Sequence, residues 1–200
     1  MLETLEKWRH YVNSCSCKEN GQIAIAADTL TKLGNIYESA EYISSNSKIV
    51  QDGQNYFAHV GHASFGLVLN SLFVSRKKSF KLDSAQAVFE MAREIHPILK
   101  NDYFLNPNRD SDDEFETSQH QYLIANAYGI FGVYSYRSVQ EYSKFYSFGS
   151  GSEFALGAME ALYDLDFSAE EIARKAVEAA AKFNDGTGLP VEVHALKAKR

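Results

Sequence analysis

The order of two helical pairs among strand-like segments constrains the fold of this chain most strongly. Apolar residues recur at three- and four-residue spacing in four stretches: 65–73, 84–99, 154–162 and 172–183. Ser84 is placed as an N-cap, and Ser168 with Glu171 has the spacing of a capping box. Each pair therefore carries an apolar stripe that another layer must cover.

Segments rich in apolar, aromatic and β-branched residues lie before, between and after these helical pairs. They are Gln22–Asp28 after the Asn20-Gly21 turn, a hairpin over 48–60 with its turn at Asp52-Gly53, then 122–136, 146–148 and 191–195. The order is strands, two helices, strands, two helices, strand. It predicts an α+β fold, a four-layer αββα sandwich with helices outside two stacked sheets.

Composition limits the classes of partner. The chain has 200 residues, 45% of them hydrophobic, which suits one domain, and 20 basic against 26 acidic residues disfavour nucleic acid and anionic membranes. Cys15 and Cys17 are the only cysteines, too few for a disulfide framework or a zinc site and compatible with the cytoplasm. No export signal is visible, and the apolar stretch 122–136 is too short to cross a bilayer.

Four segments, taken together and in this order, resemble the proteasome β subunits and their bacterial HslV-type relatives. The segments are Gly21-Gln-Ile-Ala-Ile-Ala-Ala-Asp28, Lys48-Ile-Val50, Val60-Gly61-His62-Ala63 and Gly149-Ser-Gly-Ser152 with the small residues that follow it. The resemblance covers roughly Lys18 to Leu196. It implies the N-terminal-nucleophile (Ntn) hydrolase fold over 18–200 and peptidase activity on peptides or unfolded proteins without a cofactor or metal. It also implies homomeric rings and a possible ATP-dependent unfoldase partner.

The resemblance also assigns residues to catalysis. Asp28 and Lys48 resemble the pair in which a carboxylate fixes the lysine beside the nucleophile. Gly61 resembles the glycine whose N–H faces the oxyanion. Ser150 and Asp185 resemble the residues that orient the α-amine acting as general base. The interval between Asp28 and Lys48 is a few residues longer than is usual in the family.

Plainer interpretations exist for each of these residues. An aspartate at a strand end is commonly a turn residue, and an isolated Lys48 is commonly solvated. The Gly149–Ser152 segment could be a helix cap or a phosphate cradle. His62 could line a substrate groove or be an ordinary loop residue. The polar segment 106–116, with five acidic residues from Asp110 to Glu116, is predicted to be an exposed loop; a calcium site is the alternative, although the spacing lacks the ligand order of an EF-hand.

The family nucleophile, the first residue of the mature chain, is missing from the sequence as written. The family interval places it at about Val12, which cannot attack a carbonyl; cleavage before Ser14 or Cys15 would expose a nucleophile but shorten the first strand. Read one nucleotide later, codons for Tyr11 to Cys17 permit Met-Ser-Thr-x-Val-Val-Val. We therefore hypothesise that the atypical segment 1–17 is a propeptide or comes from a shifted reading frame. A non-catalytic ring subunit and a ringless small-molecule amidase remain the alternative functions.

Overall fold

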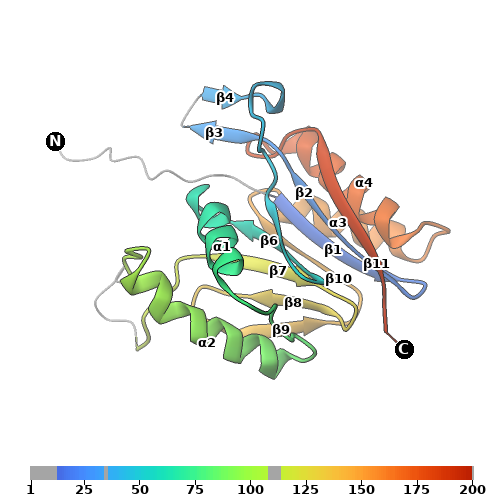
Figure 1. The fold of residues 1–200 in the computed structure, drawn as a ribbon. Coiled ribbons are helices and arrows are strands. Elements are labelled where there is room, and N and C mark those ends of the chain that lie inside the picture. The colour runs from blue at the N-terminus through green and yellow to red at the C-terminus, as the bar shows by residue number, and fades with distance from the viewer. Residues whose placement is uncertain (1–12, 34–35, 108–113, 200) are drawn as a thin grey trace.

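The chain folds into four layers, helices on the outside and two antiparallel sheets between them (Figure 1). The computed structural model describes residues 13–33, 36–107 and 114–199. The first sheet has the order β10 (Phe145–Gly149), β1 (Asn13–Glu19), β2 (Gln22–Asp28) and β11 (Val191–Lys197). The second has the order β5 (Ile49–Asp52), β6 (Asn55–Val60), β7 (Gln121–Ala125), β8 (Ile130–Val133) and β9 (Val139–Tyr142). The predicted αββα sandwich is therefore confirmed.

One helical pair covers the outer face of each sheet (Figure 1). The pairs are α1 (Ser64–Ser75) with α2 (Ala85–Asn101) on the second sheet, and α3 (Ser152–Tyr163) with α4 (Ala169–Phe183) on the first. The Ser84 hydroxyl caps α2 by accepting from the Ala87 N–H, and Ser168 and Glu171 form both bonds of the predicted capping box. The helices thus begin where the sequence indicated.

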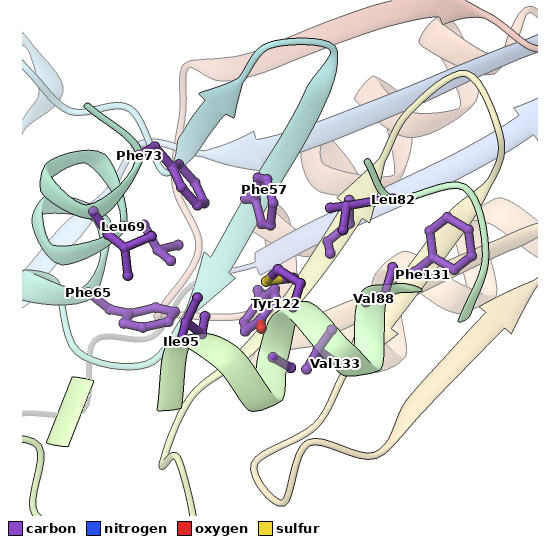
Figure 2. Packing of buried hydrophobic residues seen from close by; sticks show 14 of the residues in the cluster. Phe57, Phe65, Leu69, Phe73, Leu82, Val88, Ile95, Tyr122, Phe131 and Val133 are labelled. Carbon is purple, nitrogen blue, oxygen red and sulfur yellow. The ribbon is translucent and has the colours of Figure 1, made fainter. Parts of the chain in front are cut away.

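Three apolar clusters hold the layers together, one in each interface. Figure 2 shows the cluster beneath α1 and α2, where Phe57 of β6 and Tyr122 of β7 meet Leu69 and Ile95. A second cluster packs α3 and α4 on β1 and β2, and a third fills the space between the sheets around Ile25. This burial supplies the main driving force for the fold.

Some elements depart from expectation. The aromatic stretch 122–136 holds two strands, β7 and β8, joined at a turn around Asn126. Strand β9 was not predicted, nor were the short strands β3 (Thr31–Leu33) and β4 (Ile36–Glu38), which are followed by a 3₁₀ turn, Ala40–Tyr42. Strand β1 begins at Asn13, although the polar segment it uses fits a buried strand poorly. Residues 1–12, and 108–113 of the acidic loop, lie outside the described residues.

Candidate active site

Asp28 ends β2 and is fully buried. Its Oδ1 accepts from the Asn13 N–H at 2.9 Å, and its Oδ2 accepts from the N–H groups of Leu30 and Gly188 at 3.1 Å each. Three separate segments therefore donate to one carboxylate: the start of β1, the turn after β2, and the loop before β11. A plain turn residue would satisfy only its own turn, so this carboxylate fixes the geometry of the whole corner.

Lys48 is the partner of Asp28, as predicted. Its Nζ lies 2.9 Å from Asp28 Oδ2 and donates to the Leu30 carbonyl oxygen at 2.5 Å, while only 8% of the residue is exposed. Burial lowers the pKa of Lys48, against the opposing charge of Asp28. Burial likewise raises the pKa of Asp28, against Lys48 and the N–H donors. An ammonium so placed releases a proton more readily than a solvated one.

The Ser150 hydroxyl has Asn184 as its partner. Ser150 Oγ donates to Asn184 Oδ1 at 2.8 Å, and Asn184 Nδ2 donates back to the Ser150 carbonyl oxygen at 3.2 Å. The same Asn184 Oδ1 accepts from Thr187 Oγ1 at 3.0 Å and from the Gly186 N–H at 3.0 Å. Through these hydrogen bonds, Asn184 links the loop before β11 to the loop before α3.

Asp185, which the resemblance assigned together with Ser150 to orienting the α-amine, contacts Lys32 and not Ser150. Its Oδ2 lies 2.5 Å from Lys32 Nζ of β3, and its side chain is 71% exposed. The structure brings Asp28, Lys48 and Ser150 to one corner of the sandwich but gives the Ser150 contact to the residue before Asp185. Sequence reasoning missed Asn184 because both neighbours are polar loop residues and no periodicity tells which one points inward.

These loops converge on the N-terminal end of β1. Asn13 pairs with Gly149 of β10, and Ser147 Oγ donates to Asn13 Oδ1 at 3.2 Å. A Cβ on Gly151 would lie 2.7 Å from Thr187 Oγ1 and 3.3 Å from Asn13 Cγ, so the chain is tightly packed here. Val12, the position predicted for the nucleophile, lies outside the described residues.

Gly61 directly follows β6 and has φ +113°, a conformation that favours glycine. Two residues earlier, the His59 N–H donates to the Lys48 carbonyl oxygen at 3.3 Å, which places the end of β6 beside Lys48. The His120 ring lies behind Gly61, stacked on Phe65 with centroids 3.8 Å apart. Burial, with a smaller contribution from His62, lowers the pKa of His120 to about 4.

A cavity of about 570 Å³ opens next to Lys48, between the segment 45–51 and helix α1. The α1 residues that line it include Ser64, Gly66 and Leu67, and His59 of β6 lines it as well. Within the described residues, no group of three or more His, Cys, Asp or Glu side chains could hold a metal ion. The corner therefore presents a buried Lys–Asp pair beside an open pocket, an arrangement suited to acid–base chemistry on a bound chain.

Comparison with solved structures finds proteins of similar fold. The chain is similar to Thiobacillus denitrificans BPH, with TM-score 0.89 and 44% identity over 94% of this chain and 98% of that one. It is likewise similar to Thiobacillus denitrificans BPH in complex with epoxomicin, with TM-score 0.88 and 43% identity over 94% of this chain and 100% of that one. Eukaryotic HslV from Trypanosoma brucei shares the fold, with TM-score 0.66 and 19% identity over 92% of this chain and 99% of that one.

Other comparisons are negative. No family model matches the chain, and no curated protein matches it. In the part of the chain that the structure describes, no helix is both long enough and apolar enough to span a membrane.

Proposed function

Because the chain belongs to the proteasome β-subunit and HslV-like family of Ntn hydrolases, we propose that it is a threonine-type endopeptidase subunit whose reaction uses Asp28 and Lys48. The observation that carries this proposal is the buried contact of 2.9 Å between Lys48 Nζ and Asp28 Oδ2, at the corner where β1 starts. A hydroxyl nucleophile at the head of β1 would have this ammonium beside it, and its alkoxide form would be stabilised.

The other corner residues have supporting roles in the proposal. The α-amine of the first residue takes the hydroxyl proton as the oxygen attacks the peptide carbonyl carbon, and later gives it to the departing amine. Ser150, held by Asn184, orients that amine. The Gly61 N–H stabilises the negative charge that forms on the carbonyl oxygen, and water then hydrolyses the ester. Asp185 has no direct catalytic role in the proposal and is present only as the ion-pair partner of Lys32.

We propose that residues 1–17 as printed come from a shifted reading frame and that Ser, followed by Thr, belongs at the positions of Val12 and Asn13. The environment of β1 supports this. Ser14 is buried, and neither its Oγ nor Asn13 Nδ2 has a hydrogen-bond partner among the described residues. Each such orphan costs about 1–3 kcal/mol. The alternative frame would place Thr or Ile at position 13, which removes the unpartnered Asn13 Nδ2, and Val or Ala at the buried positions of Cys15, Ser16 and Cys17.

The gene decides the reading-frame question directly. We expect its codons from Tyr11 to Cys17 to yield a methionine and then Ser and Thr when read one nucleotide later. A stop codon in that frame, or no methionine, would end the idea. A mature chain that begins instead at Ser14 or Cys15 would point to removal of a propeptide.

We further propose that the subunit forms homomeric rings in the cytoplasm, with the active sites facing an enclosed chamber, and that an ATP-dependent unfoldase supplies unfolded substrate. The family relationship supports this assembly. A ringless protein that hydrolyses only small amides would have the same fold, and its mass in solution would be that of a single subunit.

The test of function is peptidase activity of the protein purified from its native host. We expect it to degrade an unfolded protein such as reduced casein, to bind epoxomicin, and to lose at least 100-fold of its rate in a Lys48→Met variant. The matched control is Lys81→Met, which removes a lysine whose side chain is 78% exposed and paired with Asp83. A native-host protein with no activity, or Lys48→Met with undiminished activity, would identify a non-catalytic ring subunit.

A further inference from the structure

We propose that Glu192 is a positioning residue for the reaction, which holds Lys48 in place through the hydroxyl group of Ser47. Removing its carboxylate should slow the chemical step and leave substrate binding almost unchanged. This inference rests on the proposed peptidase function, because Lys48 needs accurate placement only when a nucleophile reacts beside it.

Strand β11 positions the carboxylate of the ion pair. It is the edge strand of the first sheet and pairs with β2, where Val191 lies opposite Asp28. In the loop before β11, the Gly188 N–H donates to Asp28 Oδ2 at 3.1 Å. The Pro190 carbonyl oxygen accepts from Thr29 Oγ1 at 2.8 Å. The start of β11 and the end of β2 are therefore fixed to each other.

Glu192, the second residue of β11, reaches from the first sheet to the second. Its Oε2 accepts from Ser47 Oγ at 2.7 Å, and Ser47 directly precedes Lys48 in the chain. The same Oγ accepts from the Ile49 N–H at 3.1 Å, so the Ser47 hydroxyl spans the backbone on both sides of Lys48. Hydrogen bonds to an ionised carboxylate are about twice as strong as neutral ones. Glu192 thus ties the backbone of Lys48 to β11.

The Glu192 carboxylate is itself held in one orientation. Its other oxygen, Oε1, lies 2.8 Å from His194 Nε2, and 24% of the Glu192 side chain is exposed. The His194 ring stacks on Tyr56 of β6, with centroids 4.8 Å apart and an interplanar angle of 23°. Both carboxylate oxygens are therefore engaged, and the second sheet supports this side chain through Tyr56 as well as through Ser47.

Two tethers consequently join the same strands at this edge of the sandwich. One is the ion pair between Lys48 and Asp28, and the other is the hydrogen bond between Ser47 and Glu192. A lysine has a flexible four-carbon stem, so the ion pair alone allows the ammonium several positions around the carboxylate. Fixing the backbone beside Lys48 removes much of this freedom. Reaction rates depend steeply on such placement, so the second tether should matter for catalysis.

The experiment compares kcat and KM, on one quenched peptide, of variants made in the native host. We expect Glu192→Ala and Ser47→Ala each to lower kcat about tenfold, with KM within a factor of two. The double variant should be no slower than either single variant, because both changes remove the same contact. Glu192→Gln keeps an acceptor for Ser47 and should restore kcat to within about threefold of the wild type. The control is Glu170→Ala, which removes another partly exposed carboxylate, bound to Arg174 on α4, and should leave both constants unchanged.

The proposal is overturned when Glu192→Ala keeps the wild-type kcat, when the two single losses multiply in the double variant, or when Glu192→Gln is as slow as Glu192→Ala. A fall in kcat that only matches a loss of folded protein would likewise assign Glu192 to stability alone.

If the wild-type protein cleaves no peptide at all, the peptidase function fails, and the placement of Lys48 is tested by NMR of protein labelled with ¹³C at lysine Cε. The Lys48 signal is identified by its absence in Lys48→Met. It should move in Glu192→Ala and in Ser47→Ala and stay in place in Glu170→Ala. A signal that stays in place in both tether variants would contradict the positioning role.

Discussion

Lys48 Nζ and Asp28 Oδ2 lie 2.9 Å apart in a corner that water barely reaches, with 10% and 0% of the two side chains exposed. Desolvating two charges offsets much of their attraction, so such a pair contributes little to stability for its own sake. A role in catalysis better explains why this pair lies beside the start of β1.

Removing one partner of the pair should destabilise the fold, and removing both should not. Lys48→Met leaves the buried Asp28 carboxylate uncompensated and should lower the free energy of unfolding by about 3 kcal/mol. The double variant Lys48→Met with Asp28→Asn should recover most of this loss and yet remain without peptidase activity. Urea denaturation and casein digestion measure the two effects. A double variant that regains activity would remove the pair from the mechanism.

Asn184 and Asp185 should differ sharply in their effect on catalysis. Asn184→Ala releases the Ser150 hydroxyl and should lower kcat on the order of tenfold or more, with KM little changed. Asp185→Ala removes a largely exposed ion pair with Lys32, which contributes at most about 1 kcal/mol, and should leave kcat within a factor of two. Steady-state kinetics on one peptide distinguish them. The reverse ranking would restore Asp185 to the role that the sequence suggested.

Two glycines near the same helix should respond in opposite ways to alanine. At Gly151 an added Cβ would lie 2.7 Å from Thr187 Oγ1 and 2.9 Å from Ala180 Cβ, so Gly151→Ala should shift the active corner and lower both stability and kcat. At Gly157 within α3, a Cβ would have no described atom within 4 Å besides its chain neighbours and the backbone of its own helix, so Gly157→Ala should raise stability by roughly 0.5–1 kcal/mol. Thermal unfolding tests both. Equal responses would contradict the close packing described around Asn13.

His120 should make the protein sensitive to mild acid. Burial, and secondarily His62, lowers its pKa from 6.5 to about 4, so the unfolded chain binds a proton that the folded chain refuses. Protonation of His120 in the unfolded chain therefore lowers the free energy of unfolding as the pH falls from 6.5 toward 4, and has no such effect at higher pH. Between pH 7 and pH 5 this loss amounts to about 2 kcal/mol. His120→Phe should show a pH dependence of unfolding smaller by that amount, and an unchanged dependence would contradict the assignment.

Most of the fold could be predicted because its helices are long and periodic. The caps Ser84 and Ser168 mark where α2 and α4 begin, and Gln22–Asp28 forms the strand β2 with the predicted limits. Strands β3, β4 and β9 have only three or four residues, and β4 and β9 are exposed or half-buried, so no continuous apolar pattern marks them. Their pairing depends on neighbours that the local sequence does not specify.

The site could be predicted in part for the same kind of reason. Asp28 and Lys48 adjoin buried strands, where register determines direction, and they meet as expected. The choice between Asn184 and Asp185 depends on the course of a loop, which carries no periodicity. The cavity at His59 joins the segment 45–51 to helix α1, and only the three-dimensional packing brings these together.

The identity of the first residue tests the central claim most directly. N-terminal sequencing of the protein isolated from its native host should give Ser at the position of Val12 and Thr after it, followed by a β-branched or apolar strand in place of the residues up to Cys17. The subunit would then carry the nucleophile that the Asp28–Lys48 corner requires. A chain that begins at Met1 and continues as printed through Cys17 would contradict the account, because the fold would then have been kept without its chemistry.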